Sequence, residues 1–388
     1  MTACIVGWSH SKFGKLDDKD LEALIVEAAT GAMQDAGVGP EEVDEIFLGT
    51  FNGGMDAQDF AASMVLQASD KLRFKPATRV ENACATGSAA IYEGLNAIAA
   101  KRARFVLCVG VEKMTAISSA AVGEVLIKAS YGKEENVPGM SFPGIFGKIT
   151  QLYFQRYGDQ SDALARIAAK NHKNGVVNPY AHMRKDFGYD FCRQVSDKNP
   201  LVAGPLKRTD CSMISDGAAA CVLTDVETAL SMKKAVVFRA ASHVNDLLPM
   251  SKRDIVAFEG PELAWKKALG QARLNLLDLS LVETHDCFTS AELIEYEAMG
   301  LTPKGEGAKA ILEGWTEKTG KLPVNPSGGL KAKGHPIGAT GVSMHVMAAM
   351  QLSGEANEMQ IPNAKIAGVM NMGGAAVANY VSILEPLR

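Results

Sequence analysis

The sequence predicts an α/β protein with a largely parallel sheet, built from two similar halves. Short apolar runs alternate along the chain with helical patterns, an order that is typical of this fold class. The same order of elements starts again near residue 235. The chain has 388 residues, and chains longer than roughly 250–300 residues usually divide into more than one core. We therefore expect a duplicated architecture.

The first half is expected to begin with a strand and an amphipathic helix. Leu21, Leu24 and Ile25 share one face of that helix, and Gly37 follows as a residue suited to end it. The expected elements are a strand at 3–8, a helix at 21–36, a strand within 41–51, a helix over 87–103, a buried strand at 104–112 and a returning strand at 216–225.

The second half repeats this order with little residue identity, so the repeat rests on the pattern of elements. Its expected elements are a strand at 235–244, a helix, turn and strand within 261–286, a glycine-rich turn and helix within 328–352, and a strand at 365–374. We divide the chain into an N-terminal half at 1–234 and a C-terminal half at 235–388.

A long irregular segment at about 115–205 interrupts the first half. It contains short helical patterns such as "DALARIAAKNHKNG", together with Gly, Pro and polar turns. Such a segment is far longer than an ordinary connection, and long excursions usually carry function. We expect an inserted loop domain that contributes to function.

Charge and composition exclude several classes of protein. The net charge is −4 and no basic tract stands out, which argues against a nucleic-acid partner. No apolar run reaches the ~18 residues of a membrane span, and the N-terminus does not resemble a signal peptide. The seven cysteines are scattered without C-x-x-C spacing, so neither a disulfide framework nor a zinc site is expected. We expect a cytoplasmic protein that does not bind membranes.

Four short segments carry the candidate chemistry. They are "NACATGS" with Cys84, "THDCF" with His285 and Cys287, "GGLKAKGHPIGATG" with His335, and "NMGGAA" with Gly373. Each is expected at a strand end or a strand-to-helix turn, where open α/β sheets bind their ligands. A cysteine with histidines elsewhere in the chain is typical of a nucleophile and its bases. Two halves related by a pseudo-dyad would bring the segments together.

Each candidate also has a structural interpretation. A cysteine in a turn of small residues is commonly part of the core. His285 and Cys287 could form a metal pair, but two ligands without a third nearby do not favour a metal site. The glycine-rich stretch lacks the spacing of a phosphate-binding loop. We take His172, His182 and His243, which have no partner pattern, as structural.

At these motifs the sequence resembles the thiolase superfamily, and most closely its sterol-carrier-protein-type branch. "NPSGGLKAKGHPIGATG" is similar to the family signature, and "HDCF" is typical of the branch, where ordinary thiolases have "NEAF". The resemblance covers essentially the whole chain and implies a five-layered αβαβα fold. One position departs from the family pattern. Ordinary thiolases carry a second cysteine in a C-x-G-G motif near the C-terminus, and this sequence has Asn371 there.

The resemblance implies an acyl-CoA C-acyltransferase of lipid and fatty acid metabolism, which cleaves 3-oxoacyl-CoA with CoA or condenses acetyl-CoA. Cys84 would accept the acyl group, and the following helix and the base His335 would favour its thiolate. Cys287 would replace the missing cysteine and exchange the α-proton. His285 and His335 would hold the enolate oxygen, while the backbone amides of Cys84 and Gly373 would hold the tetrahedral oxyanion. No metal or redox cofactor is implied, because CoA is a substrate.

The predictions for binding and partners are coarser. Ser212 matches the position that contacts the pantetheine arm of CoA in related enzymes. Lys207, Arg208, Lys331 or Lys333 could meet its phosphates, and nothing in the sequence chooses among them. The resemblance implies a homodimer or homotetramer, and some relatives also bind a small OB-fold subunit.

Two other functions stay open on the sequence alone. Some relatives cleave carbon–carbon bonds by retro-aldol chemistry with a partner protein, but they lack the nucleophilic cysteine that this chain has at Cys84. The absence of a cysteine at Asn371 also leaves room for a subunit that binds acyl-CoA for a second protein without turnover. Ketoacyl-carrier-protein synthases share the fold but lack the combination of "HDCF" and "GHP".

Overall fold

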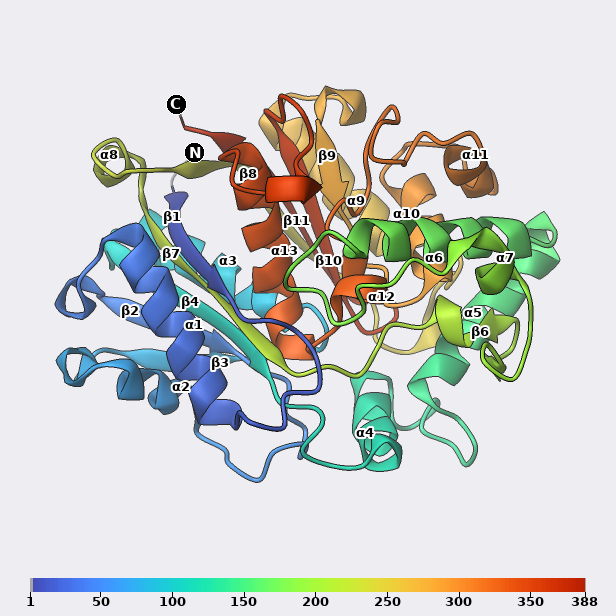
Figure 1. Ribbon diagram of the computed structural model, residues 1–388, viewed down its shortest axis with the longest axis horizontal. Coiled ribbons are helices and arrows are strands. Elements are labelled where there is room, and N and C mark those ends of the chain that lie inside the picture. The colour runs from blue at the N-terminus through green and yellow to red at the C-terminus, as the bar shows by residue number, and fades with distance from the viewer. Residues whose placement is uncertain (1–2, 388) are drawn as a thin grey trace.

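The computed structural model describes residues 3–387 and has a nine-stranded sheet at its centre (Figure 1). The strands lie side by side in the order β3-β2-β4-β7-β1-β8-β11-β10-β9. Their bounds are β1 Ala3–His10, β2 Glu45–Gly49, β3 Ala77–Val80, β4 Phe105–Glu112, β7 Gly217–Asp225, β8 Val236–Asn245, β9 Leu281–Glu283, β10 Ala367–Gly373 and β11 Ala378–Pro386. A small separate sheet pairs β5 (Leu201–Ala203) with β6 (Leu206–Lys207).

Helices cover the sheet and also lie between its two halves. In the first half, α1 packs on β1, β4 and β7, and in the second half α9 packs on β8 and β11. Between them, α3 and α13 pack on each other, and α13 contacts strands of both halves. The order helix, sheet, helix, sheet, helix confirms the five-layered α/β arrangement.

The helices have the following bounds: α1 Leu21–Ala36, α2 Ala61–Met64, α3 Thr86–Ala99, α4 Ser119–Leu126, α5 Phe142–Tyr157, α6 Ser161–Gly175, α7 Gly188–Arg193, α8 Val226–Ala229, α9 Glu259–Ala272, α10 Thr289–Ala298, α11 Gly307–Leu312, α12 Gly329–Lys333 and α13 Ile337–Leu352. For α1, the predicted apolar face and the predicted end at Gly37 are confirmed, and the structure adds a cap at Asp20. The Asp20 side chain accepts the Ala23 N–H at 2.8 Å, and Gly37 ends the helix at φ 67°. Among residues 3–387, no helix has both the length and the apolar character needed to cross a membrane.

The sheet is mixed, so the prediction of a largely parallel sheet was wrong. Within its nine strands, three neighbouring pairs are parallel and five are antiparallel. The strand β7 returns from the long insertion and lies antiparallel between β4 and β1. The turn between β10 and β11 is short, and such a turn can only join antiparallel neighbours.

The first strands of the two halves join the halves into one sheet. Cys4 pairs with Val237 and Ile5 pairs with Val236, in antiparallel register between β1 and β8. Equivalent strands of the two halves therefore meet edge to edge, as expected for halves related by a pseudo-dyad.

The helices α3 and α13 approach each other closely at their N-terminal ends. A Cβ atom on Gly87 would lie 2.7 Å from the backbone nitrogen of Val342, and one on Gly341 would lie 2.2 Å from that of Ser88. Only glycine leaves room for these contacts. The small residues after Cys84 thus bring the start of α3 against the start of α13, which follows His335.

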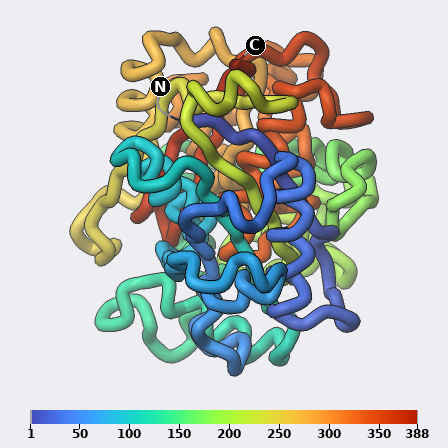
Figure 2. Tube along the Cα trace, turned by 90° about the vertical axis from the view of Figure 1, so that its left-hand side faces the viewer, coloured from blue at the N-terminus to red at the C-terminus, as the bar shows by residue number. Residues whose placement is uncertain are grey.

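The insertion between β4 and β7 contains α4 to α7 and the β5–β6 hairpin (Figure 1). Seen from the side in Figure 2, the α4 region lies beside the loop that follows β2, at the lower end of the molecule. There the Lys128 ammonium donates to the carbonyl of Gly53 at 2.7 Å. The domain limits near residues 115, 205 and 234 stay a prediction.

Candidate active site

A strained turn between β3 and α3 presents Cys84. Ala83 has φ 48°, a left-handed conformation that residues other than glycine rarely adopt. The Thr86 hydroxyl stabilises the turn by donating to the Ala83 carbonyl at 2.6 Å and accepting the Asn82 N–H at 2.8 Å. Strained backbone of this kind is concentrated at functional sites. The turn places Cys84 on the wall of a cavity, just ahead of α3.

This cavity of about 270 Å³ brings the predicted residues together. Cys84, Cys287, His335 and Ser212 all line it, and His285 is fully buried beside it. The His285 and His335 rings have centroids 5.2 Å apart and planes at 84°. The Cys84 sulfur and one ring nitrogen of each histidine all lie within 4.8 Å of one another. The Ser212 N–H donates to the Cys287 carbonyl at 2.9 Å, which holds these two segments together.

The rest of the cavity wall is mainly apolar. Phe51 comes from the loop after β2, Leu126 from α4 and Phe142 from α5, so the insertion supplies part of the wall. Further apolar lining comes from Met114, Pro143, Met213, Ile214, Phe288 and Ile337. An apolar group bound here would lie directly against the two thiols.

The two histidines have different hydrogen-bond partners. In His335 the Nδ1 atom lies 2.7 Å from the Thr340 hydroxyl, and that hydroxyl donates to the Pro336 carbonyl at 2.9 Å. The hydroxyl proton is therefore already committed, so Thr340 accepts the proton on His335 Nδ1. This leaves Nε2 of His335 unprotonated. In His285 the Nδ1 atom lies 2.9 Å from the Asn371 amide nitrogen.

Burial keeps both thiols and the base in their neutral forms. Burial raises the pKa of Cys84 to about 12, although a hydrogen bond from the Gly374 backbone opposes this shift. Burial, and then the proximity of Cys84, raise the pKa of Cys287 well above its ordinary value. Burial and then the Lys333 charge lower the pKa of His335 to about 3. These surroundings do not favour the Cys84 thiolate expected from the sequence, because burial is the largest influence on the pKa of this thiol.

Gly373 packs against the turn that carries Cys84. A Cβ atom at Gly373 would lie 2.5 Å from the Asn82 carbonyl, so the position requires glycine. Gly373 does not line the cavity that holds the thiols, and it lies instead on a neighbouring hollow with Gly374. The backbone group that reaches the Cys84 sulfur belongs to Gly374. The sequence analysis missed this residue, although the doubled glycine was visible.

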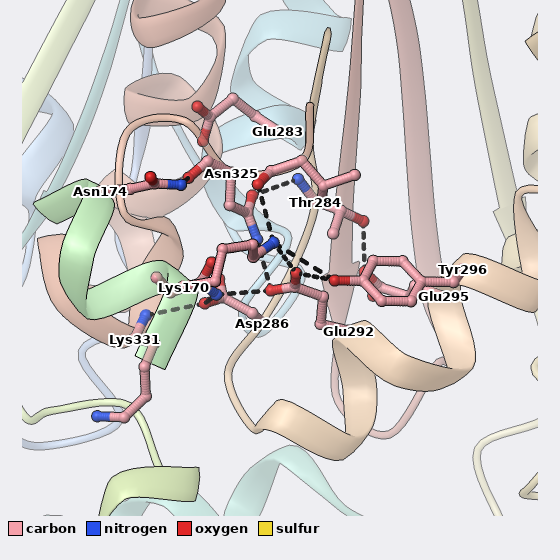
Figure 3. A network of polar contacts seen from close by, with 12 residues as sticks. Lys170, Asn174, Glu283, Thr284, Asp286, Glu292, Glu295, Tyr296, Asn325 and Lys331 are labelled. Carbon is pink, nitrogen blue, oxygen red and sulfur yellow. Dashed lines mark hydrogen bonds and ion pairs between the residues drawn. The ribbon is translucent and has the colours of Figure 1, made fainter. Parts of the chain in front are cut away.

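A buried polar network anchors the segment with His285 and Cys287 (Figure 3). Asp286, between these two residues, accepts the backbone N–H groups of Leu330 and Lys331 at 2.6 and 3.1 Å. It also accepts the Asn171 amide at 2.7 Å. Asp286 therefore joins "THDCF", the glycine-rich loop before His335, and α6 of the insertion. The Asp in "THDCF" was the only signal for this role in the sequence.

The network continues to α10 through Glu292. Its carboxylate pairs with the Lys170 ammonium and accepts the amides of Asn171 and Asn325 at 2.6 and 2.9 Å. Figure 3 shows Lys170, Glu292 and Asn325 converging from α6, α10 and the loop before α12. A buried charge is tolerated when it is paired and fully hydrogen-bonded. The network therefore fixes the loop geometry around the cavity.

The cluster of Cys84, His285 and His335 also has the spacing of a metal site. The sequence analysis counted only His285 and Cys287 as a ligand pair and so did not see this arrangement. A divalent metal requires an unprotonated nitrogen on each histidine that it binds. The protonation of the two rings therefore decides whether the cluster can hold a metal.

A basic pocket of about 330 Å³ lies next to the cavity and shares Met213 with it. Lys185, Lys198, Arg208 and Lys331 line it, together with Phe187, Phe191 and His172. Of the four cations proposed from the sequence, Arg208 and Lys331 thus face this pocket. The other two are engaged elsewhere, because the Lys207 ammonium pairs with Asp210 at 2.8 Å and that of Lys333 donates to Ser343 at 2.7 Å.

The family comparisons agree with the motifs. Residues 3–187 match the family described as Thiolase, N-terminal domain, and residues 241–386 match Thiolase C-terminal domain-like. An acetyl-CoA acetyltransferase of Methanothermobacter thermautotrophicus is 35% identical over 383 residues, which cover 98% of each chain. Human sterol carrier protein 2 is 33% identical over 395 residues, which cover 96% of this chain and 70% of that protein.

Solved structures share the fold over the whole chain. A structure described as the Ltp2-ChsH2(DUF35) aldolase has a TM-score of 0.83 at 20% identity, covering 100% of this chain and 98% of that one. Human mitochondrial 3-ketoacyl-CoA thiolase has a TM-score of 0.73 at 18% identity, with 99% and 98% covered. At these identities the likeness establishes the fold and no more.

Proposed function

Because this chain belongs to the thiolase family and is an acyltransferase of that family, we propose that it cleaves 3-oxoacyl-CoA with CoA through an acyl-cysteine at Cys84. In reverse it would condense acetyl-CoA with an acyl group. One observation carries the proposal: two thiols and two imidazoles, far apart in the sequence, meet at one small apolar cavity. A cysteine nucleophile with a neighbouring histidine base is the arrangement that acyl transfer requires.

The first half-reaction forms the acyl-enzyme. The unprotonated Nε2 of His335 accepts the Cys84 proton while the sulfur attacks the ketone carbon. Since both groups rest neutral, proton transfer accompanies the attack. The Cα–Cβ bond then breaks, the shortened acyl group stays on sulfur, and acetyl-CoA leaves as an enolate. The Cys287 thiol donates the proton to the α-carbon, for which its raised pKa keeps it in the right form.

The second half-reaction restores the enzyme. A second CoA attacks the thioester, and the Cys84 sulfur leaves and takes back the proton held by His335. The thiol proton of that CoA returns to Cys287. The overall balance is 3-oxoacyl-CoA plus CoA giving a shortened acyl-CoA plus acetyl-CoA. All the groups that move protons are side chains of this chain.

The basic pocket is the site that we propose for the phosphates of CoA. Arg208 and Lys331 line it with Lys185 and Lys198, and Phe187, which stacks on Phe191, forms part of its apolar wall. Ser212 lies on the neighbouring cavity that holds the thiols, and the two spaces share Met213. A pantetheine arm passing Ser212 would therefore connect the phosphates with Cys84. We propose that the insertion, which contributes Lys185 and Phe187, helps to bind CoA.

Partners remain part of the proposal. We expect a homodimer or homotetramer in the cytoplasm, and a small OB-fold subunit as a further partner. The name of one structural neighbour, the Ltp2-ChsH2(DUF35) aldolase, is the reason to carry a partner protein and aldolase-type cleavage as a second candidate function. Cys84 favours the thiolase reaction, because retro-aldol cleavage requires no acyl-cysteine. Size-exclusion chromatography with light scattering measures the oligomeric state directly.

Cleavage of acetoacetyl-CoA in the presence of CoA tests the proposed reaction. We expect turnover by the wild type and loss of the acyl-enzyme in Cys84→Ser, measured by mass spectrometry of the intact chain. Cys287→Ala should retain acylation but lose exchange of the α-proton of acetyl-CoA with deuterium oxide. Cys192→Ala is the matched control, because this thiol is buried on α7 outside the cavity. Normal α-proton exchange in Cys287→Ala would show that the role of Cys287 is wrong.

A further inference from the structure

Asn371 stands where ordinary thiolases carry a cysteine, and its side chain is completely buried. Its amide nitrogen lies 3.1 Å from the Cys84 carbonyl oxygen and 2.9 Å from His285 Nδ1. Its carbonyl oxygen accepts the Ser88 hydroxyl at 2.8 Å. Asn371 thus contacts the nucleophile's backbone, the start of α3 and one histidine of the site.

These partners fix the orientation of the Asn371 side-chain amide. The Cys84 carbonyl can only accept a hydrogen bond, so the NH₂ group of Asn371 must face it. The Ser88 hydroxyl then donates to the Asn371 oxygen on the other side. Gly341 preserves this arrangement, because a Cβ atom there would lie 2.4 Å from the Asn371 oxygen.

The orientation of the amide decides the tautomer of His285. The Asn371 NH₂ group donates to Nδ1, so Nδ1 must carry a lone pair and not a proton. Burial and the nearby His335 lower the pKa of His285 well below its ordinary value, so the ring is neutral. The single ring proton therefore lies on Nε2. Among the described residues, this Nε2 is buried and has no hydrogen-bond partner.

A buried N–H donor without an acceptor lowers the stability of the fold, so its presence beside the nucleophile calls for a functional explanation. We propose that Asn371 is a positioning residue that holds His285 as the Nε2–H tautomer, so that His285 donates to the enolate oxygen and cannot bind a metal ion. The donor role rests on the proposed function. The tautomer itself rests only on the three contacts of Asn371.

The hydrogen bond from Asn371 to His285 Nδ1 also prevents zinc from binding in the pocket. The Cys84, His285 and His335 cluster has a suitable spacing, but zinc at His285 Nε2 would require the proton to move to Nδ1. A proton on Nδ1 would point at the NH₂ group of Asn371, so two hydrogen-bond donors would face each other without an acceptor. An aspartate at position 371 would reverse this situation, since a carboxylate accepts the Nδ1 proton and leaves Nε2 free for a metal.

Nitrogen NMR of the full-length protein labelled with ¹⁵N-histidine tests the tautomer. His285→Gln and His335→Gln identify the two rings among the seven histidines. We expect the wild type to show His285 protonated on Nε2 and His335 protonated on Nδ1. A wild-type His285 that carries its proton on Nδ1, or on both nitrogens, would overturn the proposal whatever the activity.

Asn371→Asp tests the consequences. We expect the His285 proton to move to Nδ1. The kcat should then fall by about 10²–10³ with a small change in KM, as on loss of one oxyanion donor. Zinc chloride should bind at least about tenfold more tightly, as measured by calorimetry. Asn96→Asp, the same change at an exposed position of α3, should alter none of these. An unchanged zinc affinity and an unchanged tautomer in a folded Asn371→Asp protein would refute the role of Asn371. If the wild type has the expected tautomer but cleaves no 3-oxoacyl-CoA, the proposed function fails and the positioning role stands.

Discussion

His335 lines the cavity and His285 lies buried beside it, with the two rings packed edge to face, yet their surroundings give them opposite capabilities. His335 Nδ1 contacts the Thr340 hydroxyl, which accepts its proton and leaves Nε2 without one. His285 Nδ1 meets the Asn371 amide, which donates and leaves a proton on the other nitrogen. In the proposed reaction, two identical side chains thus serve as a base and as a hydrogen-bond donor. The partner of the second ring nitrogen decides the role.

Burial makes these different protonation states of the two rings possible. Burial lowers the pKa of both imidazoles, so each ring is uncharged and carries one proton near neutral pH. The ring nitrogen that holds this proton then decides whether the free side of the ring donates or accepts a hydrogen bond. An exposed histidine exchanges between tautomers and charge states. The polar network around Asp286 holds the segment with His285 against the loop before His335 and against α6 (Figure 3).

The largest expected effect comes from making the same substitution at both rings. His335→Asn removes the base, because an amide cannot accept the Cys84 proton, and kcat should fall by about 10²–10⁴. His285→Asn retains an N–H donor, so kcat should fall by about tenfold or less. Steady-state cleavage of acetoacetyl-CoA measures both. Equal losses in two folded variants, as judged by circular dichroism, would contradict the different roles of the two rings.

A smaller effect is expected from the partner of His335. Thr340→Val leaves a buried ring N–H without an acceptor, which should cost about 1–3 kcal/mol of unfolding free energy. We also expect kcat to fall by about tenfold, because the ring loses its preferred tautomer. Urea denaturation and steady-state kinetics give the two values. Thr340→Ser keeps the hydroxyl and should restore both. If it restores stability but not kcat, Thr340 does not set the tautomer.

The smallest expected effect is a flat pH dependence. The pKa of His335 is lowered to about 3, and that of Cys84 is raised to about 12. The neutral pair is therefore intact between these values, and it is lost below them by protonation of His335 or above them by ionisation of Cys84. The rate at which acetyl-CoA acylates Cys84, followed by mass spectrometry, should change less than about twofold between pH 6 and 9.

The His335→Asn variant sharpens this pH test. Without a base the reaction depends on preformed thiolate, whose fraction rises about tenfold per pH unit below the thiol pKa. We therefore expect a slope of about one in the logarithm of the acylation rate. A wild-type profile that bends near pH 6 or 8 would mean that Cys84 and His335 rest as an ion pair.

Much of the fold followed from local patterns. The period of apolar residues and the cap at Gly37 indicated α1, and the restart near residue 235 indicated the duplication. Strand direction did not follow, because β7 reaches its place only after the long insertion. Hydrogen bonds between β4, β7 and β1 connect residues more than a hundred positions apart, and no local pattern encodes them.

The candidate site was predictable to the level of residue identity. Cys84, His285, Cys287 and His335 were named from short motifs, and they line or adjoin one cavity. The ionisation of Cys84 was not predictable, since it depends on how deeply the folded chain buries the thiol. The cations facing the basic pocket could be chosen only once Lys207 and Lys333 were seen to have partners inside the protein.

The sequence by itself determined which chemical groups are present, the order of the elements that carry them, and the family of the chain. Only the tertiary structure decided what each group can do. The proton on His285 depends on Asn371, 86 positions away, and the orientation of Asn371 depends on Ser88, 283 positions away. Hydrogen bonds act over about 3 Å whatever the separation along the chain. The roles of the two histidines are therefore set by neighbours that meet only after folding.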